Sequence, residues 1–121
     1  MTYYDYFWPD NNIESIFIEY DKAILTVFND ELRKRVKIVC SGFAGITNLC
    51  IWDDMTIFST DLRPANQKDT FVKKIYSAYD KNFNYGGRAL NDGLLALSIE
   101  LSNHFVFSIY CLKVEVEEFY Q

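Results

Sequence analysis

Residues 13–28 read IESIFIEYDKAILTVF, and this stretch decides the fold class. Ile16 and Ile18 can face one side of a strand while the residues between and beside them face the other, a period of two that is typical of β-structure. Residues 20–22 mark a short turn, and residues 23–28 are apolar and rich in β-branched side chains. We therefore predict an antiparallel hairpin at this point of the chain.

The same alternation continues outward along the chain. One helical pattern interrupts it, because Phe71, Val72, Ile75 and Tyr76 fall on one stripe of a helix over about residues 65–81. The sequence thus predicts an α+β fold, mostly antiparallel sheet built from hairpins with one main α-helix. Further strands are predicted at residues 35–41, 46–52, 55–59, 94–101 and 105–116.

The last hairpin is the clearest, since Ser102, Asn103 and His104 separate its two apolar arms. Its second arm, residues 105–116, is unusually long for a strand. A long strand at the edge of a sheet can pair with its own copy across a two-fold axis. This arm therefore makes a homodimer one of the alternatives.

Composition predicts one domain over residues 1–121 that folds without a cofactor, metal or disulfide framework. Half of the residues are hydrophobic and 17% are aromatic, which is ample for one core. The three cysteines form no CxxC or Cys/His spacing, and we expect all of them to be reduced core thiols. No basic and aliphatic leader and no run of roughly 20 apolar residues occurs, so we expect a cytoplasmic protein with no membrane contact.

Net charge is −5, which favours basic proteins as partners and disfavours direct binding to nucleic acid. The short basic block at residues 33–37 is typical of a solvated strand edge.

Catalytic patterns are missing from the sequence. His104, the one histidine, stands at a predicted turn with no neighbouring acid or cysteine. Gly86 and Gly87 lack the Gly-Lys-Ser/Thr that would complete a phosphate loop. The sequence therefore predicts no catalytic residues, no metal site and no cofactor, and we expect a protein that is not an enzyme.

Aromatic residues beside acids are the remaining candidates for function. Trp8 ends an aromatic N-terminal cluster, and Trp52 precedes Asp53 and Asp54. Each tryptophan can pack in the core or can anchor a protein partner. The sequence leaves both interpretations open.

Three stretches carry a resemblance to a known group of proteins: DYFWPDNNIESIFIEYDKAILTVFND (5–30), VCSGFAGITNLCIWDD (39–54) and LLALSIELSNHFVFSIYCLKVEVEE (94–118). In size, acidic balance and aromatic hairpin strands the chain resembles the small immunity proteins encoded beside bacterial contact-dependent inhibition or other polymorphic toxins. The resemblance implies that the chain binds and neutralises a cognate basic toxin domain, often a nuclease. Residue type and expected exposure then select the contact residues Trp8, Asp10, Trp52, Asp53, Asp54, Asp61 and Tyr85, with Glu115, Glu117 and Glu118 as a second acidic patch. A homo-oligomeric interaction domain and a small enzyme are the alternatives.

Overall fold

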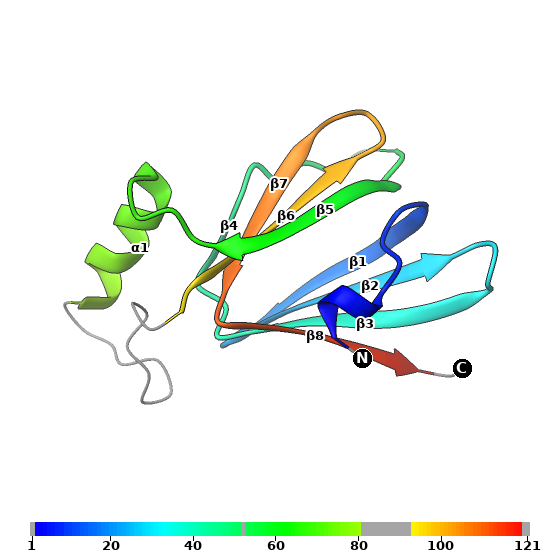
Figure 1. Ribbon diagram of the computed structural model, residues 1–121, viewed down its shortest axis with the longest axis horizontal. Coiled ribbons are helices and arrows are strands. Elements are labelled where there is room, and N and C mark those ends of the chain that lie inside the picture. Colours follow the sequence, from blue (N-terminus) through cyan, green and yellow to red (C-terminus); the bar gives the residue numbers. More distant parts are fainter. Residues whose placement is uncertain (1, 52, 81–92, 120–121) are drawn as a thin grey trace.

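The computed structural model describes residues 2–51, 53–80 and 93–119, which form two four-stranded antiparallel sheets. Sheet A has the strand order β1-β2-β3-β8, and sheet B has the order β4-β7-β6-β5. One α-helix, α1, accompanies them within these residues (Figure 1). The elements are η1 (Tyr3–Asp5), β1 (Asn11–Glu19), β2 (Lys22–Asn29), β3 (Lys34–Ser41), β4 (Gly45–Thr47), β5 (Ile57–Pro64), α1 (Thr70–Asp80), β6 (Leu95–Leu101), β7 (Val106–Cys111) and β8 (Lys113–Phe119). The predicted α+β fold of antiparallel hairpins with one helix is confirmed.

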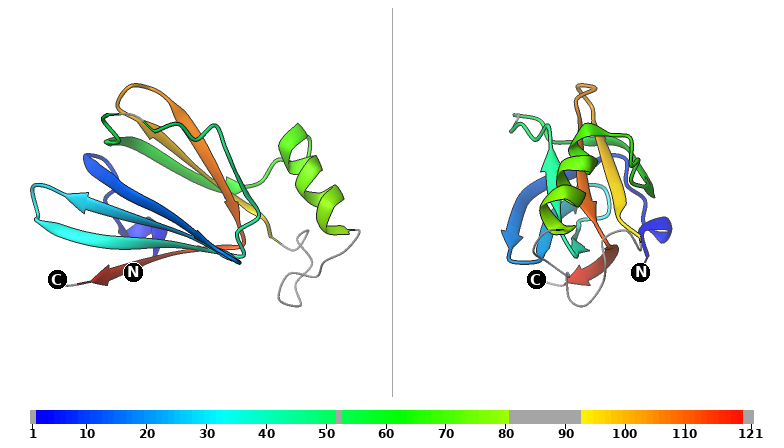
Figure 2. Two further views of the ribbon diagram at one scale, coloured as in Figure 1. Left: turned by 180° about the vertical axis from the view of Figure 1, so that it is seen from behind. Right: turned by 90° about the vertical axis from the view of Figure 1, so that its left-hand side faces the viewer.

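The two sheets face each other as a wedge that is narrow at one end and wide at the other (Figures 1 and 2). At the narrow end the chain passes between the sheets twice, from β3 to β4 and from β7 to β8. These connections lie close together, because the Leu112 N–H donates to the carbonyl oxygen of Ser41 at 2.9 Å. Gly42 has φ +65°, and a Cβ there would lie 2.8 Å from the Leu112 side chain, so glycine is required at this corner.

The core fills the space between the sheets. Leu25 and Ile38 of sheet A and Leu97, Phe107 and Ile109 of sheet B are fully buried within it. They occupy alternate positions of their strands, so the period of two in the sequence marks the inner face of each sheet.

Helix α1 covers one end of the outer face of sheet B (Figure 1). Phe71 packs against Tyr110 with ring centroids 5.2 Å apart. A Cβ at Gly45 would lie 2.8 Å from the Phe71 ring, so the helix approaches β4 closely. The outer face of sheet A carries no helix within the described residues (Figure 2).

The predicted long strand at residues 105–116 is wrong. The run is two strands, β7 in the interior of sheet B and β8 at the edge of sheet A, divided at Leu112. The inward apolar positions change phase at this point, from Phe107 and Ile109 to Val114 and Val116. The premise of a single long edge strand for a homodimer is therefore removed.

Three further boundaries differ from the prediction. The strand expected at residues 46–52 is confined to Gly45–Thr47, and the strand expected at 55–59 continues to Pro64. The helix begins at Thr70 because the Asp69 carboxylate accepts the backbone N–H of Phe71 at 2.8 Å and caps the first turn. The remainder of the predicted helix, beyond residue 80, lies outside the described residues.

Two of the three cysteines are core thiols, as predicted. Cys40 and Cys111 are both fully buried, and they come from different sheets. Their hydrogen bond, together with burial, raises the pKa of Cys40 well above its ordinary value. Cys50 is exposed, so the expectation that it lies in the core is wrong.

Candidate functional site

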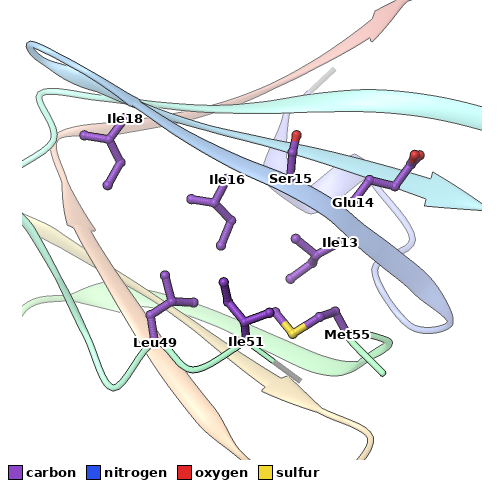
Figure 3. Close-up of a pocket in the computed structure, with 8 residues that line it drawn as sticks. All are labelled: Ile13, Glu14, Ser15, Ile16, Ile18, Leu49, Ile51 and Met55. Carbon is purple, nitrogen blue, oxygen red and sulfur yellow. The ribbon is translucent and has the colours of Figure 1, made fainter. Parts of the chain in front are cut away.

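An apolar groove lies along β1 on one side of the wedge (Figure 3). Its volume is about 220 Å³, larger than an engineered protein cavity of roughly 150 Å³ that admits benzene. Apolar side chains form both walls, with Glu14 and Ser15 at the rim. The walls are Ile13, Ile16 and Ile18 from β1 and Leu49, Ile51 and Met55 from the segment between β4 and β5.

The β1 wall results from the alternation seen in the sequence. Ile16 pairs with Leu25, and Ile18 pairs with Ala23, two fully buried residues of β2, so both isoleucines point to the inner side of sheet A. Ile18 nevertheless remains 52% exposed. In the described residues β1 is an outer strand of its sheet, so the positions beside Ile18 are not filled by a further strand.

The opposite wall is irregular chain between β4 and β5. Asn48 opens it with a positive φ of 60°, and the segment then runs to Met55, whose carbonyl oxygen accepts the backbone N–H of Ile13 at 3.0 Å. An isolated bridge between Asn12 and Thr56 follows. These contacts fix one end of the groove, and the other end opens toward Ile18.

Exposed apolar side chains occur in the groove wall, on the other face of β1 and just after β1. Ile51 is 90% exposed on its wall, and Phe17 projects from the outer face of β1. Tyr20 follows at the end of the strand and is also largely exposed. Exposed apolar area of this kind is typical of a contact site for another molecule.

One carboxylate, Glu14, lines the groove, and Asp53 and Asp54 lie in the chain just before Met55. Asp54 accepts hydrogen bonds from the hydroxyl and the backbone N–H of Thr56, which hold the pKa of this carboxyl below its ordinary value. Asp53 is exposed beside it. The Glu14 carboxylate at the rim accepts a hydrogen bond from Nε of Arg35 at 2.7 Å, so the negative charge of Glu14 is partly neutralised.

Three of the predicted contact residues fall near the end of the groove where Ile13 meets Met55. Asp53 and Asp54 belong to the wall segment, immediately before Met55. The backbone N–H of Asp10 donates to the carbonyl oxygen of Ile57 at 2.9 Å, which holds the start of β1 against the start of β5. The fold therefore brings together acids that are more than forty residues apart in the sequence.

Trp8 does not belong to this surface, and the expectation that it is exposed, on which its selection as a contact residue rested, is wrong. Its side chain is only 5% exposed and packs beside Tyr3 with ring centroids 5.2 Å apart. The indole N–H donates to the Tyr3 carbonyl oxygen at 3.1 Å. The core interpretation of this tryptophan is the correct one. Trp52 and Tyr85 lie outside the described residues.

The other predicted acids lie elsewhere. Asp61 pairs with Ser98 on the outer face of sheet B and forms an ion pair with Arg63. The second acidic patch lies on β8, the opposite edge of sheet A from the groove. Glu115 and Glu117 share one face of that strand and Glu118 lies on the other, so the three glutamates do not form one surface.

The remaining chemistry of the described residues is sparse. Nδ1 of His104 lies 3.0 Å from a carboxylate oxygen of Glu100 in an exposed pair at the β6–β7 turn. No group of three or more His, Cys, Asp or Glu side chains able to hold a metal ion occurs in residues 2–51, 53–80 and 93–119. No helix in this part of the chain is long and apolar enough to cross a bilayer.

Sequence reasoning missed the groove itself, including Leu49, Ile51 and Met55. One signal was available: β1 has apolar residues on both faces, Ile16 and Ile18 on one and Phe17 on the other, which exceeds what one buried face requires. No local pattern places Leu49 and Ile51 across a groove from β1, because that arrangement arises from the way the two sheets stack (Figure 3).

Comparison with known protein families, with curated proteins and with solved structures found no match. The resemblance to immunity proteins stays a prediction.

Proposed function

We propose that this chain is an immunity protein that binds a cognate bacterial toxin domain and neutralises it by protein–protein contact. The observation that carries the proposal is the apolar groove with carboxylates beside it on an acidic chain. Aliphatic side chains contribute contact area that excludes water, and the carboxylates favour a basic partner. This combination suits the occupation of another protein's surface.

The charge of the chain supports a kinetic advantage for such a protein. Complementary charge raises the rate of association, and desolvated apolar contact lengthens the life of the complex. An inhibitor of a toxin inside its own cell requires both properties. A basic toxin domain, such as many nucleases, is the partner that this chemistry fits best.

Growth rescue tests the proposal directly. The chain is co-expressed with the toxin domain encoded beside its gene, and we expect growth to be restored and a stable complex to be purified. A folded chain that neither restores growth nor binds the toxin contradicts the proposal.

Charge reversal tests where the toxin binds. We expect Asp53→Lys to slow association by about threefold to tenfold at low salt, with a smaller effect at high salt. Asp61→Lys is the matched control, because it changes the net charge equally but lies on the outer face of sheet B. Equal slowing by the two variants would remove the groove surface from the interface.

A further inference from the structure

We propose that β1 binds an extended partner segment as a fifth strand of sheet A, and that this segment alternates apolar residues with lysine or arginine. The inference deepens the proposed function and rests on it only for the identity of the molecule that supplies the segment. Its basis is the outer position of β1, the apolar groove beside it and the distribution of charge around both.

The backbone of β1 is oriented to accept a strand. Ile13 directs its N–H away from β2, to the Met55 carbonyl oxygen, so its pair with Val27 is a non-hydrogen-bonded pair. Hydrogen-bonded and non-hydrogen-bonded pairs alternate along an antiparallel ladder. Counting along β2 from Val27, Leu25 and Ala23 therefore also belong to non-hydrogen-bonded pairs with β1. Their partners, Ile16 and Ile18, therefore also direct N–H and C=O groups outward.

The hydrogen bond between Ile13 and Met55 already pairs the outer edge of β1 with another segment of the chain. The Asn12–Thr56 bridge extends it by one residue. Beyond Ile13, the segment 49–55 diverges from β1 and leaves the groove between them (Figure 3). A partner strand can continue along the edge from the point where the chain's own pairing ends.

The two faces of an added strand would meet different surroundings. Side chains on its inner face would enter the groove among Ile16, Ile18 and Ile51, an apolar environment. Side chains on its outer face would lie beside Phe17 and Glu19, since successive residues of a strand point to opposite faces. The inner positions therefore select apolar residues.

Charge selects the outer positions. Glu19 is exposed on the outer face of β1, and within the described residues no ion pair engages it. Opposite charges on neighbouring strands stabilise a sheet, whereas like charges destabilise it. Basic side chains are therefore the complement of this edge, and acidic ones are excluded.

The same argument disfavours a second copy of this chain as the occupant. In an antiparallel self-pairing centred on Phe17, with Ile16 of one copy opposite Ile18 of the other, Glu14 and Glu19 of both copies would lie along one seam, and β1 contains no basic residue to offset them. Each copy also carries a net charge of −5. A basic segment from another protein avoids both costs.

A peptide tests the inference without the toxin. The probe is an eight-residue, end-capped peptide that alternates valine and lysine. Two controls are a peptide of the same composition with its valines and lysines in separate blocks, and an alternating valine–glutamate peptide. We expect only the alternating valine–lysine peptide to bind, and to slow hydrogen exchange of the Ile16 and Ile18 amides, whereas the Phe17 amide, already directed to β2, changes little.

Two variants separate the backbone from the side chains. Ile18→Pro removes an outward N–H at a position where an edge strand tolerates proline, and we expect affinity for the peptide to fall at least tenfold. Ile18→Thr, its control, keeps both the N–H and the β-branch and is expected to bind more tightly than the proline variant. Ile51→Ser removes the apolar wall without touching β1 and should weaken binding by about tenfold. Leu32→Ser is its control, because Leu32 is also exposed but lies in the β2–β3 turn.

Three results would overturn the inference. The first is equal binding of the alternating and blocked peptides, and the second is binding without protection of Ile16 and Ile18. The third is protection of these amides by dimerisation of the chain alone at rising concentration, which would identify a second copy as the occupant. Growth rescue without peptide binding would contradict the strand addition and leave the proposed function intact. Peptide binding without growth rescue would contradict the proposed function and leave the strand addition intact.

Discussion

The two long sides of the wedge are built alike but are filled differently. On one side, the N-terminal residues 2–10 lie between edge strands β8 and β5, and Trp8 enters the core (Figure 1). On the other side, β1 and the segment 48–55 leave an apolar groove. A splayed pair of sheets leaves both edges to be filled, and within the part of the chain that the structure describes only one of them is.

The side filled by residues 2–10, called here the closed side, is held by polar contacts as well as by the packing of aromatic rings. The Tyr3 hydroxyl lies 2.8 Å from Oγ1 of Thr60, which ties the segment to β5. Thr2 forms a bridge with Glu115, which ties it to β8. Asn11, fully buried, donates to the carbonyl oxygens of Phe7, Trp8 and Pro9. A segment of the chain itself can therefore occupy such an edge, and under our proposal a partner does the same at the groove.

The largest effect is expected from the tryptophan that fills the closed side. Trp8→Ala should lower the free energy of unfolding by about 3–5 kcal/mol, because it removes buried area and leaves a cavity. Guanidinium unfolding followed by circular dichroism measures this. Phe7→Ala is the control: Phe7 is 65% exposed, so its truncation should change stability by less than about 0.5 kcal/mol. Equal effects would mean that the segment does not close the wedge.

A smaller loss is expected at the hydrogen-bonding centre of the same side. Asn11→Ala leaves the carbonyl oxygens of three residues without this donor and should cost about 2 kcal/mol. Chemical unfolding again measures it, with the exposed Gln67→Ala as control. A loss below about 0.5 kcal/mol would show that water takes the place of the Asn11 amide, which would mean that water can reach the buried carbonyl oxygens of the closed side.

The closed side should also weaken at alkaline pH. Burial, with a contribution from Glu118, raises the pKa of Tyr6 from 10.0 to about 12. The unfolded chain therefore releases this proton first, and the stability that Tyr6 contributes below pH 10 is lost as the pH rises toward 12. For a partly exposed ring we expect a loss on the order of 1 kcal/mol between pH 9 and pH 12, and a smaller loss in Tyr6→Phe. Identical pH profiles for the two proteins would contradict this.

The smallest effect on stability is expected on the open side of the wedge, where the groove lies. Ile51→Ser should change the free energy of unfolding by less than about 0.5 kcal/mol, since Ile51 is 90% exposed. The same substitution should reduce fluorescence of a dye that binds exposed apolar surface. A large loss of stability would mean that Ile51 serves the fold rather than the groove, and would erase the contrast between the two sides.

Much of the fold was predictable because strand alternation is local. The β1–β2 hairpin, the β6–β7 hairpin and the buried positions of Cys40 and Cys111 all follow from runs of about eight residues. The division at Leu112 is visible in the sequence as a change in which alternate positions are apolar. The sequence does not show that β7 and β8 then belong to different sheets. Which sheet receives β8 depends on pairing with β3, more than seventy residues earlier in the chain.

The candidate site was predictable only in part. Asp10, Asp53 and Asp54 were selected as exposed acids, and all three are exposed; their contact with a partner stays a prediction. Trp8 was misplaced because an aromatic residue suits a core and an interface equally well. Only packing distinguishes the two.

The sequence by itself determined the β1–β2 and β6–β7 hairpins and the acidic balance, because each depends on residues close together in the chain or on composition alone. Tertiary structure decided which edge of the wedge is filled and which is left as a groove. Those outcomes depend on how two sheets stack and where Met55 meets Ile13, contacts between residues that are distant in sequence, and no local preference encodes them.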